Sequence, residues 1–512
     1  MRQAWRGRRS LAGIALAAGL TLIPYWIAAG QAPGDTVFSG FLLNPTDGFS
    51  YLAKMRQGWD GQWLFRLSYT DAPGSPTLLF AYHLLLGHLA RALDLPLIVA
   101  YHAARGINTV LMLLAAREFF RRSSLSPEAQ TGAFALVLFG SGWGWLAAGA
   151  GFVAADLEMP EVIPWVSGYA NAHFPLASAC LLASAALFLR PPASRWAGFL
   201  MSVGCGFILG AVAGYAALPL GAAMVAWVVW FGRKAGAEGQ RPRLSILAGF
   251  LIGSVPWLTY AFWLTVTHPV LSSWFDQNLT PSPVPLSYLL AYGPLLLLVA
   301  AGSWRRGTDR TPAPTFLVIW AILMAASLYA PFSLQRRLSL GLFFALAGIA
   351  GWAIEGWARR RLAAVAAIVS GLPSLGLVVL AGLAAVRVGQ TGTVIPVHSL
   401  EAMEWLDEHA EEAAVVLAGP QTGNMLPAYA GVRVVYGHPF ETPDAEEQRI
   451  LVVDLLSGQI EAARAMEIAR DRNLSYLFYG PEEQSLGAPT WLSSLDAVFS
   501  NSLVRIYRFP AP

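Results

Sequence analysis

An aspartate in the first fifth of the chain has a type and position suited to chemistry. Asp47 follows an Asn-Pro-Thr sequence and precedes a short helical pattern, so we expect it near the N-terminus of a helix. A carboxylate there could cap the helix, or it could take a proton from a bound hydroxyl group as a general base. Tyr51 and Lys54 follow within two turns of the same pattern and are candidates for substrate binding.

Two adjacent arginines form the second candidate set. Arg336 and Arg337 lie in the short segment 329–340, between two apolar runs. An arginine at the face of a membrane is costly unless it is paired or used. Its planar guanidinium matches the oxygens of a phosphate in a bidentate manner. The side chains could instead reach ordinary head groups or pair with an acid.

A further loop, 154–175, carries acids and no basic residue. Its oxygen ligands Asp156 and Glu158, with Glu161 close by, could bind a divalent cation, or the three acids could simply be solvated. Asn171 and His173 lie where the next apolar run begins. They could contact a substrate, or His173 could be a satisfied interfacial histidine.

Arg105 lies in the early part of an apolar run, beside Tyr101 and His102. An ionisable residue inside a membrane span is a candidate functional residue. The alternative is a structural pair with an acid of the preceding loop.

The composition indicates which elements must position these residues. The chain is 55% hydrophobic and 13% charged, with a mean hydropathy of +0.50. Soluble domains carry about 25% charged residues. These values exclude an ordinary soluble protein, a disordered chain and a nucleic-acid binder with a basic surface. They predict a polytopic α-helical membrane protein.

The charges divide the chain into two predicted domains. Residues 1–390 hold 27 Lys and Arg against 14 Asp and Glu, whereas residues 391–512 hold 7 against 17. The first part is therefore basic and apolar, and the last 122 residues are acidic and resemble a small soluble domain.

Eleven apolar runs are long enough to be transmembrane helices, if about 20 residues span the bilayer. They cover residues 10–29, 96–116, 131–153, 174–190, 196–213, 216–232, 244–265, 285–303, 314–331, 338–356 and 362–386. With a cytoplasmic N-terminus, eleven spans place 19 of the 34 basic residues inside, as the positive-inside rule favours. These residues are Arg2, Arg6, Arg8, Arg9, Arg117, Arg121, Arg122, Arg190, Arg195, Arg233, Lys234, Arg241, Arg243, Arg305, Arg306, Arg310, Arg359, Arg360 and Arg361.

The segment 76–93 is a doubtful twelfth span, because it is short and interrupted by His83, His88 and Arg91. Counting it would reverse the orientation of all later loops. We therefore interpret it as an amphipathic or re-entrant helix in a long external loop, 30–95. The first apolar run imitates a signal peptide, yet further spans follow it, and we expect it to remain as a span. The C-terminal domain then lies outside the cytoplasm.

The C-terminal domain alternates helical and strand patterns, which is typical of an α/β layer fold. Helical patterns cover 398–410, 445–459 and 460–474, and strand patterns cover 413–419, 433–438, 475–481 and 502–509. The sequence has no P-loop and no Gly-rich dinucleotide fingerprint there. His438 and Glu441, on a loop after a strand, are its best polar candidates for substrate binding, or they are ordinary loop residues.

An external acid after the first span and external arginines late in the bundle resemble the GT-C superfamily of membrane glycosyltransferases. This superfamily includes protein O-mannosyltransferases, aminoarabinose transferases and arabinosyltransferases. The stretches that look like bacterial members are DGFSYLAKMRQGWDGQW (47–63), NAHFPLASACLL (171–182), PFSLQRRLSLGLFFALAGIAG (331–351), GHPFETP (437–443) and LSYLFYGPEE (474–483). The resemblance covers most of the chain in patches.

The resemblance implies a bacterial cytoplasmic-membrane enzyme that moves a sugar from a polyprenyl phosphate to an external glycan, lipid or protein hydroxyl. Asp47 matches the first-loop acid that serves as the base, and Arg336 and Arg337 would bind the lipid phosphate. Some members bind Mg or Mn at a second acid motif, where Asp156 and Glu158 lie here; others need no metal. Alternatives are a transporter or flippase of an anionic lipid, and a ligase or polymerase that uses a diphosphate lipid. Deep spans nearly free of charge argue against transport.

Overall fold

The computed structural model describes residues 2–231, 236–306, 314–412 and 414–510. Within these ranges the chain forms two compact units. One comprises residues 1–24, 102–260 and 280–382, and the other comprises 25–101, 261–279 and 383–512. Of the residues predicted to be cytoplasmic, Arg233, Lys234 and Arg310 lie outside the described ranges, as does Ala413 at the start of a predicted strand.

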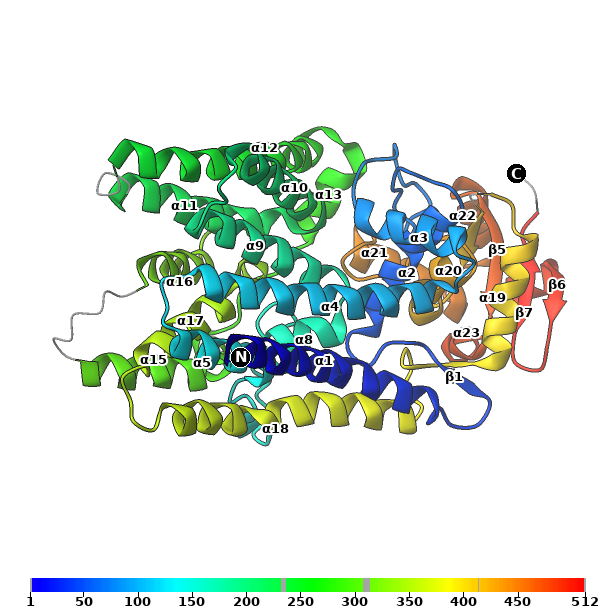
Figure 1. Ribbon diagram of the computed structural model, residues 1–512. Helices are drawn as coiled ribbons and strands as arrows, with labels where there is room; N and C mark the ends of the chain where they lie inside the picture. Colours follow the sequence, from blue (N-terminus) through cyan, green and yellow to red (C-terminus); the bar gives the residue numbers. More distant parts are fainter. Residues whose placement is uncertain (1, 232–235, 307–313, 413, 511–512) are drawn as a thin grey trace. The chain divides into compact units, whose positions relative to one another are not determined.

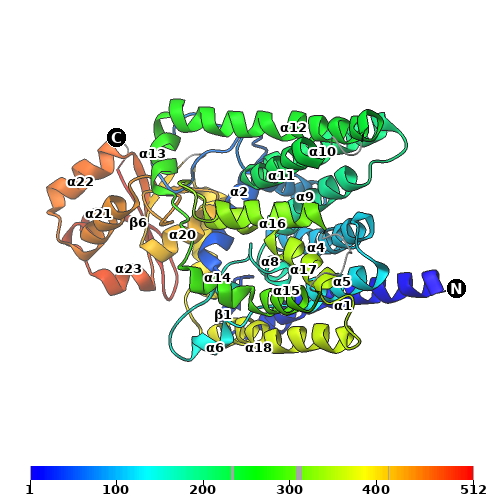
Figure 2. The ribbon, with the colours of Figure 1, turned by 90° about the vertical axis from the view of Figure 1, so that its left-hand side faces the viewer.

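The first unit, called here the helical unit, is built from apolar helices (Figure 1). The helices that lie wholly or partly in it are α1 (Arg2–Ala29), α4 (Leu97–Arg122), α5 (Pro127–Phe139), α6 (Trp145–Ala148), α7 (Ala155–Glu158), α8 (Pro164–Ala170), α9 (His173–Leu189), α10 (Arg195–Ala213), α11 (Ala217–Phe231), α12 (Gly236–Thr267), α14 (Pro285–Ala291), α15 (Gly293–Arg306), α16 (Thr315–Ser327), α17 (Leu342–Ala353) and α18 (Arg360–Arg387). Helix α17 packs against α5, α15 and α16 (Figure 2).

The described helices include five that are long and apolar enough to cross a membrane. They cover Ser10–Ala29, Leu97–Arg122, Arg195–Phe231, Gln240–Thr267 and Arg360–Arg387. Helices α14 and α15 pass the same test together but are bent by 77°, and α9 and α16 are shorter apolar helices. The chain is thus a multi-pass membrane protein. Each predicted apolar run contains helix, whereas the count of eleven crossings stays a prediction.

One predicted span, 131–153, is not a continuous helix. Helix α5 ends at Phe139, and the chain then runs through a glycine-rich segment. A Cβ on Gly142 would lie 2.5 Å from the carbonyl oxygen of Ala291, and one on Gly144 would lie 2.3 Å from Oδ1 of Asp156. These close approaches of backbone require glycine and end the helix.

The second unit, called here the mixed unit, combines helices with two sheets. Its helices are α2 (Pro45–Trp59), α3 (Ala81–Ala92), α13 (Pro269–Gln277), α19 (Val397–His409), α20 (Pro420–Tyr429), α21 (Ala445–Ser457), α22 (Ala462–Asp471) and α23 (Pro481–Leu486). Its strands are β1 (Thr36–Phe38), β2 (Val394–Pro396), β3 (Val415–Leu417), β4 (Arg433–Val434), β5 (Leu474–Tyr479), β6 (Asp496–Ser500) and β7 (Arg505–Arg508). Strands β1 and β2 pair antiparallel, so they join the first loop to the C-terminal part of the chain.

The five-stranded sheet has the order β4-β3-β5-β7-β6 and is covered on both faces. Strands β4, β3 and β5 are parallel, and β7 and β6 complete the sheet antiparallel. Side chains alternate between the faces: Val415 and Leu477 join a core with residues of α21 and α22, and Trp405 of α19 packs on Tyr476 and Phe499 from the other face. Strand β6 and helix α20 were not predicted from the sequence.

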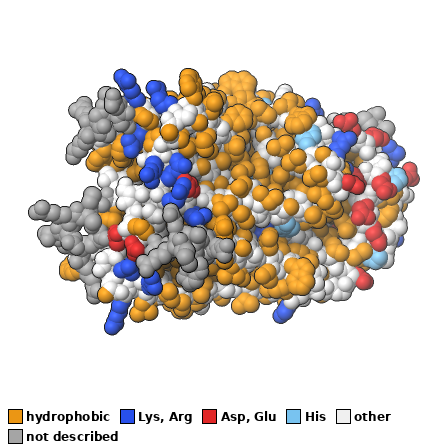
Figure 3. Space-filling model, in the orientation of Figure 1, with side chains coloured by type: hydrophobic (Ala, Val, Ile, Leu, Met, Phe, Trp, Pro, Cys, Tyr) orange, Lys and Arg blue, Asp and Glu red, His pale blue; other side chains and the backbone are white. Residues whose placement is uncertain are grey.

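The surface of the helical unit is that of a membrane protein. Figure 3 shows apolar side chains over the outer faces of its helices. Large ones such as Trp230 and Phe262 are more than half exposed. Acidic side chains gather over the C-terminal α/β layers of the mixed unit (Figure 3). An apolar exterior of this extent needs lipid as its solvent.

Candidate active site

Helix α2 presents Asp47 in its first turn, as the sequence predicts. The N-cap is Asn44, whose φ of +49° is tolerated by asparagine, and Pro45 fills the first helical position. Asp47 is therefore the third residue of the helix and does not occupy the capping position. Its side chain is 41% exposed, so the carboxylate can be reached from solvent.

Helix α2 is fixed by its close crossing with α3, beside which it lies in Figure 1. A Cβ on Gly58 would lie 2.0 Å from the carbonyl oxygen of Leu84, and one on Gly87 would lie 1.9 Å from that of Met55. The two glycines thus allow backbone-to-backbone contact. Segment 76–93 forms α3 with a buried stripe that includes His83 and Leu84, which fits the predicted amphipathic helix.

The imidazole of His438 lies beside the Asp47 carboxylate. Its Nε2 is 3.4 Å from Oδ1 of Asp47, and the histidine side chain is 2% exposed. On the other side of the ring, Nδ1 accepts hydrogen bonds from the backbone N–H groups of Phe440 and Glu441, both at 3.1 Å. The ring also packs against Tyr69, with 5.6 Å between centroids. The structure thus brings together two residues that the sequence singled out separately.

A buried ion pair lies two turns further along α2. Lys54 Nζ is 2.6 Å from Oε1 of Glu441, and the Ser50 hydroxyl donates to the same oxygen at 2.7 Å. The side chains of Lys54 and Glu441 are 1% and 12% exposed. Burial acts to raise the pKa of Glu441, but nearby Lys54, with smaller effects from His438 and Ser50, holds that pKa below its usual value.

This pairing changes the interpretation of Lys54. Its ammonium group is enclosed by Phe80, whose ring centroid is 4.4 Å away, and by the Glu441 carboxylate. A lysine buried in this way fixes the geometry of its surroundings, and contact of Lys54 with a substrate stays a prediction. Tyr51 stacks between His83 and Tyr101, at centroid distances of 5.0 and 6.2 Å, and is likewise part of the internal packing.

The loop that carries His438 is held by many hydrogen bonds. Thr442 Oγ1 accepts from the N–H groups of Gly437 and His438, and Gln277 of α13 donates to the Thr442 carbonyl oxygen. Tyr69 donates through its hydroxyl to the Asn424 carbonyl oxygen at 3.1 Å. The segment 437–442, called here the histidine loop, is therefore a defined structure.

In the helical unit, the short helix η3 (Arg336–Ser339) begins with Arg336 and Arg337. Each of these two arginines lies near an acidic side chain. Arg337 Nη1 lies 3.8 Å from Oε1 of the buried Glu161, and its guanidinium lies over the ring of Phe174 at 5.9 Å. Burial raises the pKa of Glu158, and Arg336 partly offsets that rise. Arg337 thus has an acidic partner, which the sequence left open as an alternative to phosphate binding. The distance between Arg337 and Glu161 is longer than that of a tight ion pair.

Asp156 and Glu158 do not converge on one point. Asp156 is fully buried and accepts a hydrogen bond from the Gly144 N–H at 3.0 Å, whereas Glu158 is exposed and near Arg336. In the described part of the chain, no group of three or more His, Cys, Asp or Glu side chains could hold a metal ion. The Gly144 N–H is thus a structural partner of Asp156, and the role of Asp156 and Glu158 as metal ligands stays a prediction.

Arg105 also has a structural environment. Its buried guanidinium donates to the carbonyl oxygens of Thr21, Gly168 and Tyr169 at 3.0, 2.8 and 2.8 Å, which ties α4 to α1 and α8. The substrate contact and the acid pair considered from the sequence stay predictions. Asn171 and His173 are buried at the junction of α8 and α9, within packed protein.

Comparisons with known proteins identify the fold. No family model and no curated protein matches the chain. Among solved structures, the oligosaccharyltransferase of Archaeoglobus fulgidus in the apo form aligns over 92% of this chain and 69% of its own, with 13% identity and a TM-score of 0.57. ArnT from Cupriavidus metallidurans bound to undecaprenyl phosphate aligns over 97% and 98%, with 15% identity and a TM-score of 0.51.

The arabinofuranosyltransferase AftD from Mycobacteria aligns over 98% of this chain but 41% of its own, with 15% identity and a TM-score of 0.54. The chain has the GT-C fold. The sequence resemblance is thereby confirmed at the level of the fold. One of the similar oligosaccharyltransferase structures is a complex with Zn and sulfate, which is a property of that protein.

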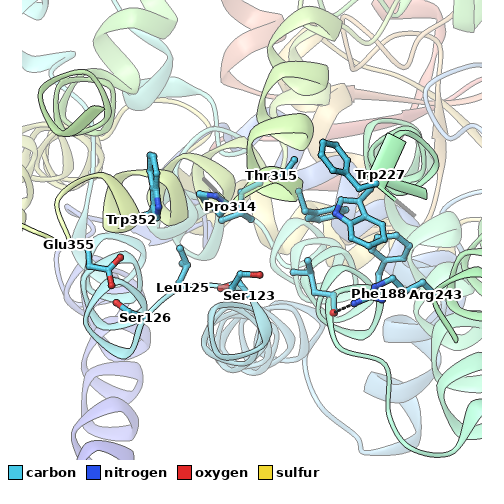
Figure 4. A pocket seen from close by; sticks show the side chains of 15 residues that line it. Ser123, Leu125, Ser126, Phe188, Trp227, Arg243, Pro314, Thr315, Trp352 and Glu355 are labelled. Carbon is cyan, nitrogen blue, oxygen red and sulfur yellow. Dashed lines mark hydrogen bonds between the residues drawn. The ribbon is translucent and has the colours of Figure 1, made fainter. Parts of the chain in front are cut away.

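The GT-C chain also contains a pocket of about 550 Å³ in the helical unit, which none of the candidate site residues lines (Figure 4). Arg243 lies over Trp227 at 4.8 Å and donates to the Leu189 carbonyl oxygen at 3.3 Å. The loop 123–126 forms another wall. The predicted topology puts this loop on the cytoplasmic face, away from the predicted external chemistry.

Sequence reasoning did not identify Ser50 and Tyr69 as components of these clusters. It also did not predict that Glu161 pairs with Arg337. Ser50 lies one turn before Lys54 on the same face of α2, which is a signal that helical spacing could have supplied. Tyr69 and Glu161 gave no such signal, because their partners come from distant segments.

Proposed function

We propose that this chain transfers a sugar from a polyprenyl-phosphate donor to an extracytoplasmic hydroxyl group on a glycan, lipid or protein. The observation that carries the proposal is the position of Asp47. Its partly exposed carboxylate stands in the first turn of α2 with one oxygen beside the buried imidazole of His438. A carboxylate that is held on one side and accessible on the other suits a general base.

The reaction would be a single inverting displacement. The acceptor oxygen attacks the anomeric carbon, its proton passes to Asp47, and the bond from that carbon to the phosphate oxygen breaks. The polyprenyl phosphate leaves with the electron pair. Arg336 and Arg337 would stabilise the charge of this phosphate, since guanidinium groups bind phosphate oxygens in a bidentate manner.

The structural relatives support the choice of a lipid carrier. ArnT, which has the same fold, was solved with undecaprenyl phosphate, and the archaeal oligosaccharyltransferase was solved tethered to an acceptor peptide. Both are consistent with a site that receives a lipid phosphate and an acceptor. The positive-inside assignment puts the first loop and residues 391–512 outside the cytoplasm of a bacterial inner membrane.

The test uses the purified full-length chain in proteoliposomes with undecaprenyl-phosphate-linked hexoses and arabinose. Release of undecaprenyl phosphate, in the presence of a cell-envelope extract as the acceptor source, reports turnover. Asp47→Asn should lower the turnover by about 10²- to 10⁴-fold, the usual contribution of a general base. Asp94→Asn is the matched control, because Asp94 is exposed and its φ of +50° suits asparagine equally well. Full turnover by Asp47→Asn would refute the assignment of the base.

A further inference from the structure

The hydrogen bonds of the histidine loop determine which nitrogen of His438 carries its proton. Nδ1 accepts two backbone N–H groups, those of Phe440 and Glu441. Both partners are donors, so Nδ1 must offer its lone pair, and the proton of the neutral ring resides on Nε2. That Nε2–H is the atom nearest to Asp47.

Nε2 lies beside the carboxylate of the proposed base but makes no hydrogen bond within the described residues. The distance of 3.4 Å from Nε2 to Oδ1 is longer than a tight charge-assisted hydrogen bond. Such bonds are often long in an empty site and shorten once substrate is bound. Because the ring is 2% exposed, its Nε2–H is shielded from solvent, and the Asp47 carboxylate lies next to it.

Two contacts join the same face of α2 to the histidine loop. Asp47 and Lys54 are seven residues apart, which is two helical turns, and their partners His438 and Glu441 are three residues apart. The buried pair Lys54–Glu441 thus fixes the loop, and the fixed loop sets the position of the imidazole. Thr442 and Gln277 secure the other end of the loop.

We propose that His438 is a positioning residue for Asp47: its Nε2–H holds one carboxylate oxygen so that the other oxygen points at the acceptor hydroxyl. This inference rests on the proposed function. In the reaction the acceptor proton passes to the other oxygen of Asp47, and His438 keeps its own proton throughout. The charged and titratable groups that face His438 are Asp47 and Lys54 from α2, Glu441 from its own loop and Tyr69 from the first loop.

Two substitutions separate the two ring nitrogens. His438→Asn keeps an acceptor near the Nδ1 position and loses the donor at Nε2. His438→Gln can place an amide N–H near the Nε2 position and loses the loop acceptor. If the donor to Asp47 matters, His438→Asn should lower kcat by about 10- to 100-fold, the worth of a hydrogen bond to a charged group, without raising KM for the lipid donor. His438→Gln should retain more of the turnover than His438→Asn.

The same variants in the Asp47→Asn background distinguish positioning from a purely structural role. With the base removed, His438→Asn should change the residual turnover by less than about twofold. The inference is overturned if His438→Asn is as active as the wild type, if Asn retains more activity than Gln, or if its effect is equally large in both backgrounds. Wild-type turnover by Asp47→Asn itself would instead refute the proposed function. Thermal unfolding of each variant identifies any that fail to fold, and the remaining variant then decides.

Discussion

Lys54 Nζ and Glu441 Oε1 lie 2.6 Å apart in the interior of the mixed unit, although 387 residues separate them in the chain. The pair is accompanied by the Ser50 hydroxyl and covered by the ring of Phe80. Buried pairs of this kind add little net stability compared with apolar residues, but loss of one partner leaves a charge without compensation. The pair therefore acts as a geometric constraint between α2 and the histidine loop.

Removal of one partner should cost far more than removal of both. Lys54→Met leaves Glu441 buried without its cation and should destabilise the fold by about 3–5 kcal/mol. Lys54→Met combined with Glu441→Leu should recover most of that loss, since both side chains then pack as apolar groups. Thermal unfolding in detergent, followed by tryptophan fluorescence, measures the three variants.

Turnover adds a second readout to these variants. The double variant should fold yet turn over more slowly than the wild type, because the histidine loop loses its attachment to α2. An additive loss of stability in the double variant would contradict the ion pair, and wild-type turnover would contradict the constraint on the loop.

The crossing of α2 and α3 should not tolerate a single added carbon. Gly58→Ala and Gly87→Ala would each place a Cβ about 2 Å from a carbonyl oxygen of the other helix, so each should destabilise the protein by several kcal/mol or force the helices apart. Gly132→Ala is the control, because a Cβ on this α5 residue meets nothing within 4 Å and alanine favours the helix. Thermal unfolding compares the three, and equal melting temperatures would contradict the close crossing.

Much of the fold follows from periodicity and composition. The apolar runs became helices, the short stretch 76–93 became the amphipathic α3, and the alternation after residue 391 became strands and helices of a mixed sheet. The break after Phe139 could not be predicted in the same way. It arises because Gly142 and Gly144 pass close to the backbone of Ala291 and the side chain of Asp156, and such long-range contacts leave no local pattern.

The sequence predicted the members of the candidate site one by one and did not predict which of them contact each other. Asp47 follows from its position at a helix start, and His438 and Glu441 follow from their place on a loop after a strand. Their partnership with Asp47 and Lys54 depends on a contact across nearly 400 residues, which helical spacing cannot reveal. The bonds of Arg105 to backbone carbonyl oxygens could not be predicted either, because they reach α1 and α8 from α4.

The Glu161 carboxylate should oppose the binding of phosphate by Arg337. Arg336→Gln and Arg337→Gln should each weaken undecaprenyl phosphate binding by about tenfold, the equivalent of one charge-assisted bond. Glu161→Gln should tighten binding by about two- to fivefold, because Arg337 would no longer share its charge with the carboxylate 3.8 Å away. Native mass spectrometry with undecaprenyl phosphate measures these affinities.

Arg359→Gln provides the control for this series, since Arg359 is exposed and lies in a predicted cytoplasmic segment. Its affinity should equal that of the wild type. If Arg359→Gln weakens binding as much as Arg336→Gln does, the effect is one of total charge and not of a phosphate site.

A buried carboxyl group in the C-terminal layers should make stability fall as the pH rises. Burial, and then the neighbouring Glu482 carboxylate, raises the pKa of Glu483 to about 7. Between the ordinary glutamate pKa of about 4.3 and this value, the folded chain keeps a proton that the unfolded chain has lost. Unfolding then releases a proton, so the free energy of unfolding decreases with pH across this window, by up to about 3 kcal/mol.

The melting temperature of the wild type should accordingly drop between pH 5 and pH 8, whereas Glu483→Gln should show a flatter profile from a lower starting point. The lower start follows because both Glu483 oxygens accept backbone N–H groups, from Gly419 and Gly480, and an amide offers one oxygen. Glu447→Gln, at an exposed position of α21, should keep the wild-type slope. Parallel profiles for wild type and Glu483→Gln would show that another group causes the pH dependence.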